Sequence, residues 1–260
     1  MLYLIYQTYK VIALETEDTL KEKLYTIPVN DAFATPCECP VCKMKKTLET
    51  DAIDYTMGPS YMEDDIREET NRLGFCGKHV KMLYGNQNRL GLALMLKTHM
   101  DKTIDDLTAL SENSPKVKGS LFKKTVEHNS VKDYVDTLDS SCFVCNRIEN
   151  TFNRYLITML HLYKTDKSFQ DKLNSSKGLC TTHYSMLYDL AATNLSGDTL
   201  TSFYNDINKL YIDNMKRVRD DLDWFISKFD YRFANEPWKN SKDALPRAIT
   251  KTNSIVNELQ

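Results

Sequence analysis

The tetrapeptide CPVC at Cys39–Cys42 returns as CFVC at Cys142–Cys145, 103 residues further along the chain. A second motif follows each of them: GFCGKH at Gly74–His79 returns as GLCTTH at Gly178–His183, offset by 104 residues. The tripeptide MLY also follows each histidine, at 82–84 and at 186–188. Identities held in near-constant register are typical of an internal duplication. The sequence therefore predicts two related units.

Each unit carries three cysteines and one histidine in a pattern that suits a metal ion. Three thiolates and one imidazole are a ligand set of tetrahedral structural Zn²⁺ sites. In CxxC the two sulfurs can hold one ion from a tight turn, and in CxxH ligands three apart point to one side of a helix's first turn. Gly74 and Gly178 can each end one helix in a left-handed conformation before the next helix begins. The predicted ligands are Cys39, Cys42, Cys76 and His79 in the first unit and Cys142, Cys145, Cys180 and His183 in the second. We expect two zinc ions per chain, each joining the start of a helical hairpin to the helix that follows it.

Three other interpretations of the cysteines stay open. They could be small buried apolar residues that bind nothing. The same ligands could hold an iron–sulfur cluster, although the long gap between the half-sites matches no compact cluster motif. Cys37 has no counterpart in the second unit, and it could be a resolving thiol in metal–thiolate redox sensing or a free cysteine without a role.

Helical periodicity dominates the rest of the chain. Apolar residues recur every three or four positions after Cys145, and the same period runs from Leu200 to Ile226 over about seven turns of a helix expected from Gly197 onward. Only 8 glycines and 7 prolines favour long helices over many short strands. We expect an all-α fold of pseudo-duplicated helical units, each stapled by a Cys₃His zinc site.

The motifs and polar stretches divide the chain into five predicted parts. These are a leader at 1–35, a first metal-binding helical repeat at 36–115, a linker at 116–138, a second repeat with the long helix at 139–230, and an irregular tail at 231–260. The tail is expected to be irregular because it contains Pro237 and Pro246. A basic run in the linker, formed by the four lysines Lys116, Lys118, Lys123 and Lys124, is interpreted as a solvated face.

One difference between the repeats predicts a binding surface. The first repeat contains MEDDIREETN at 62–71, whereas the comparable stretch of the second, at 166–171, is plainer. A duplicated scaffold can keep one copy for structure while the other binds a ligand. The predicted polar surface consists of Glu63, Asp65, Arg67, Asn71, Asn88 and Arg89. The alternative is that these residues are helix caps and solvated helix faces.

Composition limits the classes of partner and compartment. The formal net charge of −2 gives no general electrostatic reason to bind nucleic acid, so a nucleic-acid-binding zinc module is only an alternative. No apolar stretch approaches the ~20 residues of a membrane span, and the N-terminus lacks the basic region of a secretory signal. Clustered cysteines then indicate a cytoplasmic protein.

The expected function is a binding or regulatory module rather than an enzyme. No Ser/His/Asp, phosphate-loop or dinucleotide motif is recognisable, and four protein ligands leave a zinc ion no open position for hydrolysis. The partner is an unknown protein or small molecule. The long helix could also support a homodimer.

Several segments together resemble a bacterial family of unknown function whose members carry tandem cysteine and histidine motifs. The resemblance is carried by KLYTIPVN at 23–30, the paired metal motifs, NRLGLAL at 88–94 and FDYR at 229–232. It covers most of the chain beyond residue 20, implies metal sites and implies no established activity.

Overall fold

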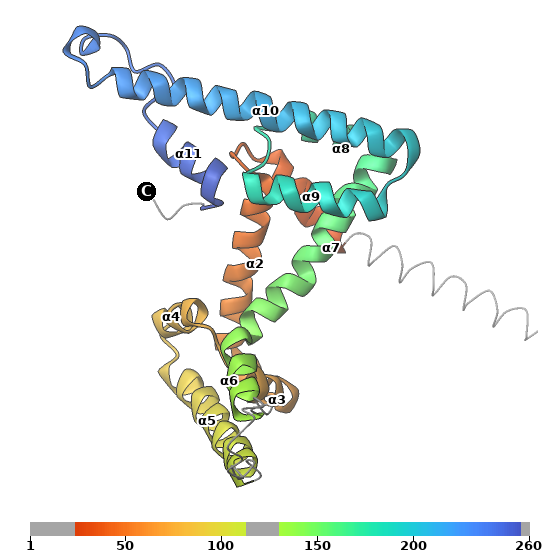
Figure 1. Ribbon diagram of the computed structural model, residues 1–260, viewed down its shortest axis with the longest axis vertical. Coiled ribbons are helices and arrows are strands. Elements are labelled where there is room, and N and C mark those ends of the chain that lie inside the picture. The colour runs from red at the N-terminus through yellow and green to blue at the C-terminus, as the bar shows by residue number, and fades with distance from the viewer. Residues whose placement is uncertain (1–23, 113–129, 256–260) are drawn as a thin grey trace, which may run out of the picture. The chain divides into compact units, whose positions relative to one another are not determined.

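A computed structural model describes residues 24–112 and 130–255 (Figure 1). Helices are the only regular elements in these two ranges, which confirms the predicted all-α class. Most of the predicted leader and the four linker lysines fall outside the described residues. None of the helices described is both long and apolar enough to cross a membrane.

The described residues divide into two compact units that do not coincide with the predicted repeats. The outer unit comprises residues 24–47 and 151–255, and the inserted unit comprises residues 48–112 and 130–150. Both boundaries fall inside helices, α2 (Pro40–Met57) and α7 (Phe143–Thr165). The first predicted repeat therefore contributes to both units, and so does the second.

The inserted unit is built around the long helix α5 (Arg89–Glu112). This helix contacts α3 (Asp64–Leu73), α4 (Gly77–Gly85) and α6 (Ser130–Ser140). A short 3₁₀ helix, η1 (Pro59–Met62), leads from α2 into α3. The ends of α2 and α7 that belong to this unit complete its apolar core, which includes Ala52, Ile53, Met57, Leu83, Leu92, Met95, Val144 and Ile148.

The outer unit is built around α10 (Gly197–Ser227), the long helix that the sequence predicts. Its contacts are with α8 (Lys167–Ser175), α9 (Thr181–Asn194) and α11 (Ala244–Asn253), and α11 also contacts α9 (Figure 1). The buried face of α10 consists of Phe203, Ile207, Leu210 and Val218. The apolar period of this helix is therefore used for packing within its own unit.

The segment after residue 230 differs from the irregular tail that the sequence predicts. It contains a short 3₁₀ helix, η2 (Tyr231–Phe233), and α11. In the sequence Pro246 predicts a break in helical structure. In the structure it is the third residue of α11, within the first turn, where the missing N–H costs no intrahelical hydrogen bond. α11 matters for the metal site because its Lys251 is only 1% exposed.

Candidate metal centres

The eight predicted ligands form two groups of four, and each group combines both repeats. The outer site consists of Cys39, Cys42, Cys180 and His183, and the inserted site consists of Cys76, His79, Cys142 and Cys145. Within each group the ligand atoms all lie within 4.8 Å of one another. The structure confirms two groups of three cysteines and one histidine, made from the eight predicted residues. The expectation that each group forms within one repeat is wrong.

The course of two helices explains the exchange. α2 begins with the first CxxC in the outer unit and ends in the inserted unit, whereas α7 begins with the second CxxC in the inserted unit and ends in the outer one. Each CxxC therefore lies in a different unit from the hairpin that follows it in sequence. It meets the CxxH motif of the other repeat instead.

All four half-sites have the same local geometry. In each, the first ligand immediately precedes a helix and the second is the third residue of that helix: α2, α4, α7 and α9 begin at Pro40, Gly77, Phe143 and Thr181. The carbonyl of each leading cysteine accepts the N–H four residues on, from Lys43, Val80, Asn146 and Tyr184, at 2.9–3.2 Å. Two helix N-termini therefore converge on each site, where their partial positive charge stabilises thiolates.

The outer site is fully buried. His183 Nδ1 lies 3.5, 3.3 and 3.1 Å from the Sγ atoms of Cys39, Cys42 and Cys180. None of the four ligands is more than 4% exposed. Tetrahedral zinc with Zn–S of about 2.3 Å and Zn–N of about 2.0 Å separates its ligand atoms by about 3.5–3.8 Å, so the donor set fits such an ion closely.

The inserted site has the same donors but is more open. His79 Nδ1 lies 3.3, 3.4 and 3.2 Å from the Sγ atoms of Cys76, Cys142 and Cys145. His79 and Cys142 are buried, whereas Cys76 and Cys145 are half-buried. Cys76 also lines a cavity of about 440 Å³ between the Gly74 turn, α5 and the end of α6. Solvent can therefore reach one edge of this site.

The residue that supports the histidine differs between the sites. Glu49 accepts a hydrogen bond from His79 Nε2 at 3.3 Å, which leaves Nδ1 directed at the sulfurs. Metal-binding histidines commonly have such a carboxylate partner. Burial lowers the pKa of His79, and Glu49 opposes this shift only in part. In the outer site the ring of Phe152 lies against His183, with the centroids 5.5 Å apart.

Glu49 is a residue that the sequence prediction did not identify. Glu49 lies seven residues after Cys42, and Phe152 lies seven residues after Cys145, so the two occupy equivalent positions in α2 and α7. Two helical turns place both side chains on the ligand-bearing face. That spacing could have indicated Glu49 as a supporting residue. Alignment of the two repeats hides it, because the equivalent residue of the second repeat is Phe152.

The pKa values of the ligand thiols are shifted in different directions. Burial is the main cause that raises the pKa of Cys39 to about 12. The pKa of Cys180 lies far below its usual range because Cys39 and Cys42 donate hydrogen bonds to its thiolate. In the inserted site burial opposes ionisation of Cys76, but backbone N–H groups of His79 and Lys78 lower its pKa. In each cluster the cysteine of the CxxH motif is therefore the thiol whose pKa is lowered.

Cys37, the proposed resolving thiol, belongs to neither group of ligands. It is half-buried, and burial raises the pKa of its thiol more than the neighbouring Lys43 lowers it. A thiol with a raised pKa is a weaker nucleophile at neutral pH. The redox role of Cys37 stays a prediction.

Both glycines that precede the CxxH cysteines have positive φ, 57° for Gly74 and 78° for Gly178. A Cβ on Gly74 would lie 2.6 Å from His99 Nε2, and one on Gly178 would lie 3.2 Å from the carbonyl oxygen of Leu210. Positive φ and close packing both require glycine here. The predicted positive φ is confirmed at both glycines, but only Gly74 caps a helix, with ψ of −154° rather than a left-handed helical value, and Gly178 lies beyond the end of α8 at Ser175.

Different bonds join the two half-sites in each unit. In the inserted unit the N–H of Phe143 donates to the Gly74 carbonyl at 3.0 Å, and Ser141 Oγ donates to the Leu73 carbonyl at 2.7 Å. Pro40 replaces Phe143 at the equivalent position of the outer site, and proline has no N–H to donate. Another donor must join those two segments.

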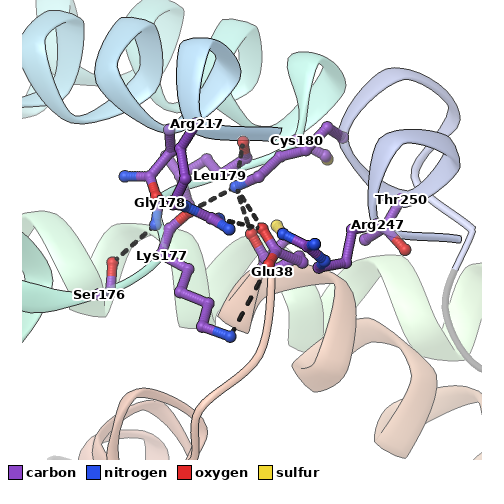
Figure 2. A network of polar contacts seen from close by, with 12 residues as sticks. Glu38, Ser176, Lys177, Gly178, Leu179, Cys180, Arg217, Arg247 and Thr250 are labelled. Atoms are coloured by element: carbon purple, nitrogen blue, oxygen red, sulfur yellow. Dashed lines mark hydrogen bonds and ion pairs between the residues drawn. The ribbon is translucent and has the colours of Figure 1, made fainter. Parts of the chain in front are cut away.

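Lys251 of α11 is that donor. Its Nζ donates to the carbonyls of Glu38 at 2.6 Å and Leu179 at 3.5 Å, and also to that of Lys177. The Glu38 carboxylate, 8% exposed, completes the cluster: it lies 2.5 Å from Arg217 Nη2, 3.4 Å from Lys251 Nζ and 3.8 Å from Lys177 Nζ. Figure 2 shows Arg217 and Lys177 directed towards Glu38, near Cys180. The C-terminal helix therefore fixes the outer site.

Three of the six residues of the predicted polar surface, Asn71, Asn88 and Arg89, make side-chain contacts within the inserted unit. Asn88 caps α5, since its Oδ1 accepts the N–H of Gly91 and its Nδ2 donates to the Met57 carbonyl, both at 2.9 Å. The Asn71 side chain accepts the Thr98 hydroxyl, and the Arg89 guanidinium lies 3.7 Å from the ring centroid of Tyr84. Glu63 and Asp65 are exposed at the start of α3, and Arg67 is half-buried. A shared binding surface of these residues stays a prediction.

Comparison with known proteins gives a family and no activity. No curated protein and no solved structure matches the chain significantly. A family model described as a family of unknown function, DUF6062, matches residues 20–259, which include both metal centres and the C-terminal helix. The chain therefore belongs to the DUF6062 family.

Proposed function

We propose that both clusters bind Zn²⁺ as structural sites, and that the protein is a zinc-stapled helical module that binds a partner or ligand and is not an enzyme. The observation that carries the proposal is the closed donor set. Each cluster offers three sulfurs and one imidazole nitrogen at the separations of tetrahedral ligands, which leaves no position for a substrate. Soft thiolate ligands and tetrahedral geometry favour zinc or iron–sulfur over hard cations.

The bound metal would supply folding free energy. Structural zinc sites bind with apparent free energies of about 10–16 kcal/mol at pH 7, and that energy stabilises only the folded chain. The outer site joins segments 144 residues apart and the inserted site joins segments 63 residues apart. Closing long loops restricts the unfolded chain most.

Metal analysis of the purified full chain tests this proposal. We expect about two zinc ions per chain and no visible absorbance. Cys180→Ala and Cys76→Ala should each leave about one zinc ion, while Cys37→Ala, as the matched control, should keep two. Stoichiometric iron with absorbance near ~400 nm would replace zinc with a cluster. A chain that folds equally well without any metal would contradict the structural role.

A second function, redox sensing, is favoured by one observation and would belong to the inserted site. Cys76 and Cys145 are half-buried, with their Sγ atoms 3.9 Å apart. Hydrogen peroxide, a two-electron oxidant, would convert these two thiolates to a disulfide and would itself be reduced to two water molecules, taking up two protons. The zinc ion would lose two ligands and be released. The fully buried outer site would then keep the protein folded.

Three further properties are part of the proposal. The two repeats descend from an internal duplication, and the matching CxxC and CxxH motifs support this. The protein works in the cytoplasm, where a reducing environment keeps its seven cysteines as thiols. A homodimer would use the exposed apolar residues near the end of α10, which are Ile226, Phe229 and Tyr231.

A further inference from the structure

A basic cavity lies in the outer unit beside the Glu38 network, since Lys177 and Arg217 belong to both. Its volume is about 520 Å³. The lining comes from three parts of the chain: Lys177 before the GxCxxH motif, one face of α10, and the segment 239–247. Five of the eight lining residues are lysine or arginine and two are aspartate, so the lining carries about three excess positive charges in a chain whose net charge is −2.

The two arginines form a rigid wall. Arg247 donates to Asp221 at 2.7 Å and to Asp243 at 2.9 Å, and its third nitrogen bonds to the Asn240 carbonyl. Arg217 donates to Glu38 at 2.5 Å. These bonds pair both lining aspartates with Arg247, whose single positive charge offsets one of their two negative charges.

The three lysines are less well compensated. Lys177 is 49% exposed and lies 3.8 Å from a carboxylate that already pairs with Arg217 and Lys251. Lys242 is exposed and has no hydrogen bond or ion pair to any residue that the structure describes. Positive charge therefore remains available at the mouth of the cavity.

Lys239 provides an independent indication of a ligand site. Its backbone has φ of 51°, a region that non-glycine residues seldom adopt. Its Nζ lies 3.6 Å from the ring centroid of Trp224, which holds the ammonium group in place. Strained backbone of this kind concentrates at ligand-binding segments.

We propose that this cavity binds a small, multiply charged anion of the phosphate type, such as a diphosphate or a phosphorylated metabolite. The volume lies within the range of about 300–1,000 Å³ of small-molecule sites. The lysines suit phosphate oxygens because they supply mobile charge and ammonium donors, while the two arginines, already bonded to protein acceptors, add fixed positive charge. The ligand class goes beyond the proposed zinc function and depends on different side chains.

The two tryptophans of the chain provide the measurement. Trp224 carries Lys239 on its ring, and Trp238 precedes Lys239 in sequence. Intrinsic fluorescence of the metal-loaded full chain, in 150 mM KCl, therefore reports directly on this segment. We expect saturable binding of pyrophosphate in the micromolar to millimolar range, confirmed by calorimetry, with orthophosphate binding more weakly.

Charge variants separate this site from general electrostatics. Lys242→Gln and Lys177→Gln should each weaken pyrophosphate binding at least threefold, and the double variant at least tenfold. Lys209→Gln removes the same charge from an exposed pair with Asp213 on α10 and should leave binding unchanged. Metal content and circular dichroism of each variant show whether zinc sites and fold are intact, so failure of this proposal is distinguishable from failure of the zinc function.

Three results would overturn the proposal. One is the lack of saturable pyrophosphate binding up to 10 mM by the metal-loaded chain. Another is equal loss of affinity in Lys209→Gln and Lys242→Gln. The third is binding of a DNA oligonucleotide without binding of pyrophosphate, which would assign the basic surface to a polyanion instead.

Discussion

At the scale of single residues, the surroundings of each histidine distinguish the two metal centres. Glu49 directs His79 by a charged hydrogen bond, whereas Phe152 packs against the ring of His183. The carboxylate raises the basicity of the imidazole and fixes its orientation. The two sites therefore have the same types of ligand, but the histidine is oriented by a carboxylate in one and packed against an aromatic ring in the other.

Glu49→Gln tests this support. The amide keeps the size of the side chain but removes its charge, so we expect zinc affinity of the inserted site to fall by about 10–100-fold. Competition with a chromophoric chelator measures the change. Phe152→Leu is the matched control at the equivalent position and should leave the inserted site unaltered. Equal affinity in wild type and Glu49→Gln would show that the carboxylate plays no part.

Gly74 gives a second test at this scale. Gly74 has φ of 57° and ψ of −154°, a region almost restricted to glycine, and a Cβ there would meet His99. Gly74→Ala should lower the free energy of unfolding by about 1–3 kcal/mol. Gly77→Ala is the control, because a Cβ on Gly77 would have no atom within 4 Å and alanine suits the helix. Urea unfolding should place Gly77→Ala at or above wild type, and equal losses in both variants would contradict the argument.

At the scale of elements, local patterns predict more than long-range ones. The CxxC and CxxH spacings predict ligand types and the CxxH helix starts, since these depend on neighbouring residues. The pairing of half-sites has no local signal, because either CxxC with either CxxH gives the same Cys₃His set. The role of α11 was also not predictable, since Pro246 resembles a break and the partners of Lys251 lie more than 70 residues away.

Lys251→Met tests the role of α11. Methionine keeps an unbranched side chain but has no ammonium group. The variant therefore loses the hydrogen bonds to three carbonyls and the positive charge 3.4 Å from the Glu38 carboxylate. Glu38 keeps its ion pair with Arg217, but three carbonyls lose their buried donor at a cost of about 1–3 kcal/mol each, so we expect a loss of about 3–5 kcal/mol in the free energy of unfolding. Lys209→Met removes an exposed lysine and should change stability by less than about 0.5 kcal/mol. A urea unfolding midpoint equal to that of the control would show that Lys251 does not join the half-sites.

At the scale of the whole molecule, the two sites are nested along the chain. The ligands of the inserted site all lie between the two halves of the outer site. Each compact unit has one complete site, although each predicted repeat supplies half of both. This arrangement could not be deduced from the repeats alone, because α2 and α7 each run from one unit into the other.

The difference in burial predicts the order in which the sites lose metal. Cys76 and Cys145 are half-buried, whereas the outer ligands are at most 4% exposed. Mild peroxide should therefore release one zinc ion well before the second. A zinc-sensitive dye follows the release, and mass spectrometry should find Cys76 and Cys145 oxidised while Cys180 is intact. Simultaneous release, or earlier oxidation of Cys180, would contradict the difference in access.

The central claim, that each Cys₃His cluster combines the CxxC motif of one predicted repeat with the CxxH motif of the other, is tested most directly by the zinc content of two double variants. Cys39→Ala with Cys180→Ala removes two ligands of the outer site only, so the structure requires that about one zinc ion per chain remains. Cys39→Ala with Cys76→Ala removes one ligand from each site, and we expect both ions to be lost or greatly weakened. If the first double variant loses both ions and the second keeps one, the sites form within the repeats and the account is wrong.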